Sequence, residues 1–178
     1  SLVTPDRLRF DFSHFRQVTP EELDLVEEKV NEMIMQNIPS EVHDNTPMEE
    51  ALSMGAMALF GEKYGERVRV VSFGKSVELC GGTHVDRTSR IGLFKIISEG
   101  AVAAGVRRIE AVTGRNAVSY INDKLKILDE ITSMLRSTGN PVVNITKLMS
   151  ENTALKGTIE KMQAAAAAAA RNELTSRA

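Results

Sequence analysis

The chain lacks the residues typical of secreted, membrane-spanning and base-stacking proteins. Its 178 residues include one cysteine, no tryptophan and 4% aromatic residues. One cysteine excludes an internal disulfide framework and fits a reducing compartment. Scarce aromatics argue against broad stacking on unpaired bases. No apolar run is long enough for a bilayer and no signal-peptide pattern opens the chain, so we predict a cytoplasmic protein without a membrane partner.

The charge is nearly balanced. The 22 Lys and Arg residues face 24 Asp and Glu residues, giving a formal net charge of -2. The chain therefore has no overall basic field for nucleic acid, and any contact with a polyanion must be local. It begins at Ser1 without an initiating methionine, so we expect it to be a piece of a longer protein.

The most informative motif holds the only cysteine. Cys80 is followed by Gly81, Gly82 and Thr83, and then by His84. A thiolate and an imidazole four residues apart can bind one metal ion from the same side of a turn, and the glycines allow a close backbone approach. Two ligands are only half of a zinc site. On spacing alone, a buried free cysteine beside a surface histidine is the simpler interpretation.

Two other histidines, His14 and His43, could supply a third ligand if the fold brought either one near. We favour the interpretation that both are solvated, one at the end of a strand and one in a loop.

Alternation and cap signals predict a mixed α and β first part. Thr19, Pro20 and the acids after them predict the start of a helix that ends near Asn37. We also predict a turn at residues 45–47 and a second helix at 48–59, closed by Gly61 or Gly65. The other predicted elements are strands at 8–12, 39–43, 68–73, 77–79, 91–98 and 106–113 and a turn at 101–105.

From Asn116 onward the pattern is helical. Helices are predicted at 117–135 and from 145 to about 171, separated by Gly139, Asn140 and Pro141. Their apolar spacing fits two helices packed against each other. We therefore predict an α+β fold with a small mixed or antiparallel sheet at 1–115, followed by an antiparallel helical hairpin at 116–178.

Charged residues in two predicted strands suggest further site residues. Arg9 and Asp11 share a strand face and could line a cavity, or they could form the wet face of an edge strand. Arg107 and Arg108 are adjacent and must face opposite sides. One could meet a phosphate while the other pairs with a carboxylate such as Glu110 or Asp11, although two structural salt bridges are at least as well supported.

Four blocks of sequence carry a resemblance to a known family. They are residues 8–14, 55–64, 76–84 and 104–114. In this order they resemble the editing region of alanyl-tRNA synthetases, and the likeness extends from residue 1 to about residue 115. The later residues are similar only in kind, to the helical arm that leads to the C-terminal domain of the family.

The resemblance implies a fragment of an ATP-dependent alanine–tRNA ligase whose editing domain hydrolyses mischarged seryl- or glycyl-tRNA(Ala). It implies zinc held by a His-x-x-x-His pair and a Cys-x-x-x-His pair. Cys80 and His84 match the second pair, whereas the first has no counterpart here. We therefore expect a zinc half-site and little or no activity from this piece alone.

The resemblance also suggests roles for the remaining candidates. Gly81, Gly82, Thr83, Arg9 and Asp11 are then pocket residues, because an editing pocket must admit a small side chain that carries a hydroxyl. The two adjacent arginines in the last predicted strand, Arg107 and Arg108, are candidates for the acceptor end of tRNA(Ala).

Two alternatives stay open. One is a free-standing deacylase related to this domain. The other is a non-catalytic tRNA-binding or dimerisation module in which the helices at 116–178 pair two chains. The related domain of threonyl-tRNA synthetases is a weaker match, because the blocks at Cys80 and Arg107 look alanyl.

Overall fold

The computed structural model describes residues 1–57, 64–136 and 139–176, and side chains as far as residue 172. By their contacts the residues form two compact units, Ser1–Ile121 and Asn122–Ala178. The first unit contains two antiparallel sheets with short helices, and long helices occupy the rest of the chain. The α+β class is therefore confirmed, with two sheets in place of the one predicted.

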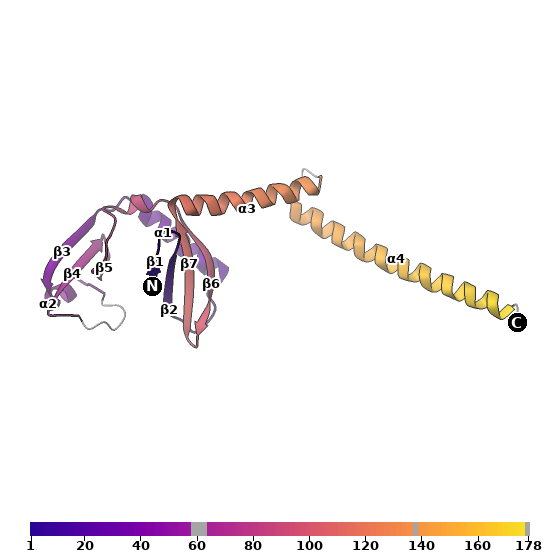
Figure 1. Cartoon of the computed structure of the whole chain (residues 1–178), viewed down its shortest axis with the longest axis horizontal. Coiled ribbons are helices and arrows are strands. Elements are labelled where there is room, and N and C mark those ends of the chain that lie inside the picture. Colours follow the sequence, from indigo (N-terminus) through magenta and orange to yellow (C-terminus); the bar gives the residue numbers. More distant parts are fainter. Residues whose placement is uncertain (58–63, 137–138, 177–178) are drawn as a thin grey trace. The chain divides into compact units, whose positions relative to one another are not determined.

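The larger sheet has four strands in the order β1-β2-β7-β6 (Figure 1). These are β1 (Leu2–Val3), β2 (Leu8–Ser13), β6 (Phe94–Ala103) and β7 (Val106–Thr113). All neighbours are antiparallel. The predicted turn at 101–105 is shorter than expected, because β6 continues to Ala103 and Gly105 makes the tight turn with φ of 70°.

The smaller sheet has three strands in the order β3-β4-β5: Ser40–Pro47, Arg67–Phe73 and Ser76–Leu79. The predicted turn at 45–47 is wrong, since these residues belong to β3. The register shifts between His43 and Thr46, and Asn45 has φ of 55°. A β-bulge therefore bends the strand where a chain reversal was expected, and Asn tolerates that backbone conformation well.

Helix α1 (Pro20–Met35) begins as predicted. The Thr19 hydroxyl accepts a hydrogen bond from the Glu22 amide, and the Glu22 carboxylate accepts one from the Thr19 amide. This reciprocal capping box satisfies two amides that the first turn would otherwise leave without partners.

Helix α1 packs on the larger sheet. Ile34 of the helix lies in a buried cluster with Phe94 and Ala111. The Asn31 side chain exchanges two hydrogen bonds of 2.9 Å with the Phe94 backbone, and Glu27 accepts a hydrogen bond of 2.8 Å from the Ile96 amide. These two side chains thus pair with the backbone of β6, which is an edge strand.

Helix α2 (Met48–Ser53) is shorter than the predicted helix at 48–59. It ends before Gly55, which has φ of 83°, and not at Gly61 or Gly65. Residues 58–59 and Gly61 lie outside the described residues. Ala51 of this helix and Val70 of β4 are fully buried together, so α2 covers the smaller sheet.

The predicted strand at 91–98 begins too early. Thr88–Ile91 form a short 3-10 helix, η1, and Gly92 follows with φ of 70°. A Cβ at Gly92 would lie 3.1 Å from the Gly114 Cα, so the chains cross closely here and β6 starts only at Phe94. Buried Thr88 accepts a hydrogen bond of 2.9 Å from the Ile38 amide.

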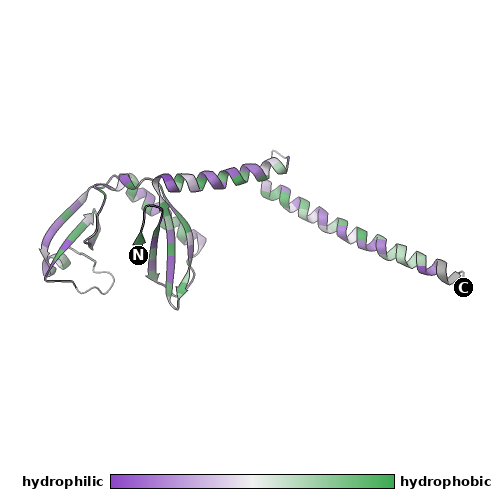
Figure 2. Cartoon of the chain, viewed as in Figure 1, coloured by the Kyte–Doolittle hydropathy of each residue, from purple (hydrophilic) through white to green (hydrophobic). Residues whose placement is uncertain are grey.

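Helices α3 (Gly114–Met134) and α4 (Pro141–Ser176) confirm the two predicted C-terminal helices, with α4 longer than expected. The predicted packing between them is not observed, since their apolar side chains are exposed. Those expected at the seam include Leu125, Leu128, Leu148, Leu155, Ile159 and Met162, each at least 45% exposed. Figure 2 shows apolar and polar residues alternating along both helices. No helix among the described residues is both long enough and apolar enough to span a membrane.

Candidate functional site

The Cys80–His84 segment leaves the smaller sheet at the end of β5. The Cys80 amide still donates to the Arg69 carbonyl of β4 at 3.1 Å, which extends the ladder by one residue. Cys80 is half-buried, and the four residues after it are exposed. Among the described residues, neither the Cys80 sulphur nor the His84 ring makes a hydrogen bond or an ion pair. Both donors are therefore accessible.

The two glycines are not required by the packing of the chain itself. Neither has a positive φ. A Cβ at Gly81 would meet nothing within 4 Å, and one at Gly82 would lie 3.6 Å from the Cys80 sulphur. A side chain at Gly82 would therefore contact the sulphur, which is consistent with glycines that keep the approach to this donor open.

The His84 ring lies against the end of β4. Its centroid is 6.2 Å from that of Phe73, and the rings are tilted by 44°. This contact orients the imidazole without using either of its nitrogen atoms, which leaves the lone pair of the neutral ring for a ligand.

Arg69 holds the other end of the segment. Its Nη1 donates to the carbonyls of Cys80 at 2.9 Å and Gly82 at 2.8 Å. Its Nε lies 3.1 Å from a carboxylate oxygen of Asp44 in the bulge of β3. One guanidinium thus joins both neighbours of β4 across the smaller sheet.

Cys80 and His84 do not make up a complete set of metal ligands among the described residues. The described residues contain no group of three or more His, Cys, Asp or Glu side chains that could hold a metal ion. His14 and His43 therefore do not complete the set, and the ring of His14 instead lies near that of Phe12. A thiolate and an imidazole suit zinc, and they supply two of the four donors that a structural site uses.

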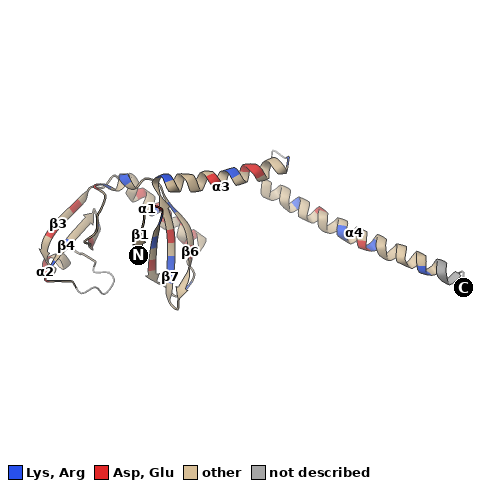
Figure 3. Cartoon of the chain, in the orientation of Figure 1, with Lys and Arg blue, Asp and Glu red and all other residues tan. Residues whose placement is uncertain are grey.

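The second set of candidates lies on the larger sheet. Figure 3 shows charges of both signs along β2 and β7. Asp11 is directly opposite Arg108, and their side chains form two parallel hydrogen bonds of 2.6 and 2.8 Å. This hydrogen bonding lowers the pKa of the Asp11 carboxyl and raises the pKa of Arg108. Of the two carboxylates predicted as partners for one of these arginines, Asp11 is the one that pairs, and it pairs with Arg108.

Arg107 faces the other side of the sheet, as adjacent strand residues must. It makes a two-pronged ion pair with Glu99 of β6, whose carboxylate is 3% exposed. The Arg107 hydrogen bonds lower the pKa of the Glu99 carboxyl. Both adjacent arginines therefore have carboxylate partners within the chain.

Arg9 differs from these arginines. It lies on the same face as Asp11 and directly opposite Glu110, but Glu110 accepts from Arg7 at 3.2 Å and from Ser98 at 3.1 Å. The buried Nε of Arg9 has no hydrogen-bond partner in the structure. A buried donor without an acceptor destabilises the fold. Among the arginines of this face, Arg9 is therefore the one whose hydrogen-bonding groups are not used within the described part of the chain.

Comparison with known proteins identifies these residues as parts of a recognised domain. The sequence profile of the threonyl and alanyl tRNA synthetase second additional domain matches residues 68–110. An alanine–tRNA ligase of Bacteroides fragilis is 51% identical over 174 residues, which are 98% of this chain and 20% of that protein. The chain belongs to the alanine–tRNA ligase family.

Other ligases of this family match equally well. One from Stenotrophomonas maltophilia is 53% identical over 180 residues, covering 100% of this chain and 20% of the ligase. One from Xanthomonas campestris is 52% identical over 176 residues, covering 98% and 20% respectively. The chain thus spans about a fifth of the length of these alanine–tRNA ligases.

The matched domain runs from β4 to β7. It includes the Cys80–His84 segment as well as Arg107 and Arg108, whereas Arg9 and Asp11 precede it. In the described residues no hydrogen bond or ion pair joins the Cys80–His84 segment to the charged face of the larger sheet. The candidates therefore form two separate groups.

The sequence alone did not indicate two residues that support the Cys80–His84 segment of this alanine–tRNA ligase region. They are Arg69 and Asp44. The only local signal is a charged residue within the β-branched run of β4, and such a residue is compatible with an ordinary strand. Their partnership with the Cys80 segment depends on strand register and on a bulge, and neither follows from local spacing.

Proposed function

We propose that this chain is the editing region of a cytoplasmic alanine–tRNA ligase, and that it takes part in hydrolysing mischarged seryl- or glycyl-tRNA(Ala). The observation that carries the proposal is the Cys80–His84 pair within the matched second additional domain, a half-buried thiol and an exposed imidazole without hydrogen-bond partners among the described residues. The identity to alanine–tRNA ligases also covers α3 and α4. This supports a region of such a ligase over a free-standing deacylase.

Zinc is the metal that suits this donor pair. Cys80 and His84 would supply two donors, and two more must come from outside the described residues, because those residues hold no larger group. When bound, zinc would supply positive charge to polarise a carbonyl or a water molecule. Affinity should be low when only a thiolate and an imidazole are present.

The segment between the two donors is suited to the aminoacyl group. Gly81 and Gly82 present exposed backbone without side chains, and the Thr83 hydroxyl can donate to or accept from a serine hydroxyl. Recognition of that hydroxyl is what an editing site needs, since an apolar synthetic site rejects it poorly.

The charged face of the larger sheet would serve the acceptor end of tRNA(Ala). Arg9 is the best-supported contact, because its guanidinium makes no hydrogen bond or ion pair among the described residues; its Nε is buried, so its terminal nitrogens would make the contact. Asp11 holds Arg108, so this pair would brace the face. Arg107 lies on the opposite face and is bound to Glu99, so it would meet a phosphate only on that other face and through its remaining guanidinium nitrogen.

The test measures zinc content and Ser-tRNA(Ala) hydrolysis in the 178-residue chain and in a longer ligase containing it. We expect about one zinc and clear hydrolysis only in the longer protein. Cys80→Ala or His84→Ala there should reduce hydrolysis at least tenfold, by analogy with lost metal-site interactions. His43→Ala, which changes an exposed histidine of the same sheet, is the matched control. Unchanged hydrolysis in His84→Ala, or one zinc in the short chain, would contradict the proposal.

A second candidate function is self-association through α4, favoured by its exposed apolar seam. In α4 the residues of this seam recur at alternating spacings of three and four, as at the a and d positions of a coiled coil. They are Ile145, Leu148, Asn152, Leu155, Ile159 and Met162. Isoleucine at a, leucine at d and one asparagine at a are typical of a parallel two-stranded coil.

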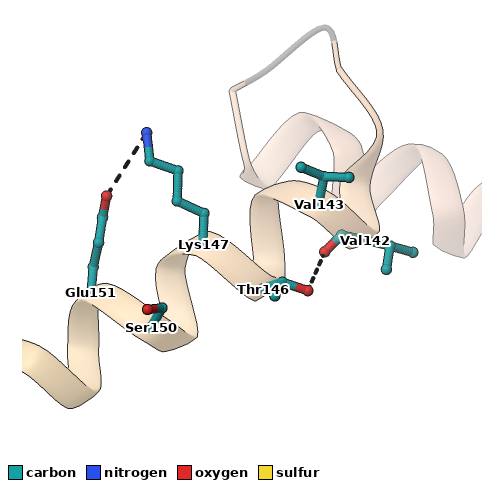
Figure 4. A pocket seen from close by; sticks show the side chains of 6 residues that line it. All are labelled: Val142, Val143, Thr146, Lys147, Ser150 and Glu151. Atoms are coloured by element: carbon teal, nitrogen blue, oxygen red, sulfur yellow. Dashed lines mark hydrogen bonds and ion pairs between the residues drawn. The ribbon is translucent and has the colours of Figure 1, made fainter.

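Charge along this seam fits a second copy of the chain. Glu151 and Lys156 occupy g and e positions five residues apart, which is the spacing of ion pairs between parallel partners. Among the described residues Glu151 makes one ion pair, with Lys147 at 3.8 Å, and the exposed Val142 and Val143 lie nearer the start of the same helix (Figure 4). We therefore propose a parallel pair of α4 helices.

Light scattering over a range of concentrations tests this assembly. We expect a monomer–dimer equilibrium that Lys156→Glu weakens severalfold, because two like charges then oppose each other. Adding Glu151→Lys should restore it, and Lys161→Glu, outside the seam, is the control. A monomer at every concentration would contradict the assembly.

A further inference from the structure

Arg69 occupies an unusual place in the smaller sheet. It belongs to the central strand, β4, and its guanidinium reaches the chain on both sides of that strand. On one side it meets Asp44 of β3, and on the other it meets the carbonyls of Cys80 and Gly82. All three contacts lie between 2.8 and 3.1 Å.

The bulge in β3 explains how Asp44 reaches this position. The ladder pairs His43 with Val70 and Thr46 with Val68, so Asp44 and Asn45 both lie opposite Arg69. The bulge is closed by a hydrogen bond of 3.2 Å from the Thr46 hydroxyl to the His43 carbonyl. An extra residue there redirects a side chain, and Asp44 is thereby brought to the Arg69 Nε.

The contacts of Arg69 also determine where the backbone donors of the turn point. Both carbonyls accept from the same nitrogen, Nη1. Because a trans peptide places its C=O and N–H on opposite sides, the amides of Gly81 and Thr83 are directed away from Arg69. Neither amide has an acceptor among the described residues. The guanidinium thus turns two carbonyl oxygens inward and two N–H groups outward.

We propose that Arg69 is the positioning residue of the Cys80–His84 turn. By holding both carbonyls it fixes the Cys80 sulphur beside the outward amides of Gly81 and Thr83, which then serve as donors to the aminoacyl ester. Fixed backbone N–H groups of this kind stabilise a carbonyl oxygen that gains negative charge. The role of the amides in hydrolysis rests on the proposed function. The positioning of the turn by Arg69 does not.

The positioning can be measured without any substrate, in the 178-residue chain. Arg69→Gln removes the guanidinium with its hydrogen bonds and its charge. The Cys80–His84 turn should then open more often. We expect amide exchange at Cys80 and alkylation of its thiol by iodoacetamide each to become about tenfold faster, as for the loss of two hydrogen bonds. Arg69→Lys should recover only part of this, because an ammonium cannot reproduce a planar fork.

A matched control is available on the same strand. Arg67 also donates from Nη1 to a backbone carbonyl, that of Asn45, but it has no contact with the turn. Arg67→Gln should leave both Cys80 rates within about twofold of the parent. Equal acceleration in the two glutamine variants, or no acceleration in Arg69→Gln, would overturn the inference.

Kinetics in a longer ligase that contains this region tests the catalytic part separately. Arg69→Lys should lower kcat for Ser-tRNA(Ala) hydrolysis about tenfold, with KM and zinc content unchanged, as for a lost backbone donor. A fall in zinc content, or a change in KM alone, would overturn the assignment of the amides. Absence of hydrolysis in the parent would instead contradict the proposed function, while the Cys80 rates would still report on the positioning.

Discussion

The two sheets of the first unit treat their polar groups in opposite ways. On the larger sheet, Asp11 and Glu99 are each bound by an arginine within the chain. At the end of the smaller sheet, Cys80 and His84 are accessible and make no hydrogen bond among the described residues. The carboxylates of the larger sheet are thus used in ion pairs within the chain, whereas the thiol and imidazole at the end of the smaller sheet are left without partners in the described part of the chain, on a turn that Arg69 holds. This contrast supports the proposal that the editing site lies at the end of the smaller sheet.

The strongest test of this difference is to destabilise the larger sheet and ask whether the smaller sheet is affected. Phe94 is 8% exposed and lies in the cluster beneath α1. Phe94→Ala should lower the free energy of unfolding by about 3–5 kcal/mol, from lost burial and the cavity left behind. Urea denaturation measures this loss, and the amide exchange of β4 shows whether the smaller sheet opens too. Val142→Ala on the exposed surface of α4 is the control.

The exit of the Cys80–His84 segment depends on one hydroxyl. Thr88 donates to the Met33 carbonyl at 2.9 Å and accepts from the Ile38 amide. Thr88→Val should cost about 1–3 kcal/mol of stability, because that amide loses its acceptor in a buried site. Thr88→Ser keeps the hydroxyl and should retain most of the stability. Equal losses in the two variants would show that the methyl group matters instead, and chemical denaturation distinguishes the cases.

Acid should destabilise the start of helix α1 through the carboxylate of its capping box. Hydrogen bonds from Arg16, with a smaller contribution from the Thr19 amide, lower the pKa of Glu22 from 4.5 to about 2. A depressed carboxyl pKa stabilises the fold above the unfolded value, and that stability is lost as pH falls from about 4.5 to about 2. Glu22→Gln should therefore reduce the slope of melting temperature against pH between about pH 4.5 and about pH 2. An unchanged slope would contradict the role of the capping carboxylate, and Glu21→Gln is the control.

The smallest expected effect is at Gly82. Gly82→Ala adds a Cβ only 3.6 Å from the Cys80 sulphur, at an exposed position with no positive φ. Stability should change by less than about 0.5 kcal/mol, as for other surface substitutions. Alkylation of Cys80 should nevertheless slow about twofold, because the methyl group covers part of the sulphur. Gly81→Ala, with open space around it, should alter neither quantity.

Local signals sufficed for much of the fold. Thr19 and Pro20 correctly predicted the start of α1, since a capping box depends only on neighbours in sequence. Alternation and β-branched residues located β2, β4 and β7. The predicted turn at Asn45 was wrong for a physical reason: the same residue types that make turns also make bulges, and only the partner strand distinguishes the two.

The site was predictable only where its chemistry is carried by adjacent residues. The spacing of Cys80 and His84 drew attention to them, but the zinc role came from the family resemblance, because spacing alone favours a free cysteine beside a surface histidine. Arg69 and Asp44 could not be found from spacing, because their contacts join segments that are 11 to 25 residues apart. The zinc half-site and the roles of the pocket residues remain predictions. The exposed seam of α4 shows a further limit, since a periodic pattern indicates a partner without saying which helix supplies it.

The side chains of Asn31 and Glu27 carry a consequence for the behaviour of the protein at high concentration. An edge strand with free amides can recruit strands from other molecules and so begin aggregation. Here two helical side chains occupy the amides of Phe94 and Ile96 on β6. Helix α1 thus acts as a surrogate strand that terminates the sheet, and it protects the chain from growing into a fibre along that edge.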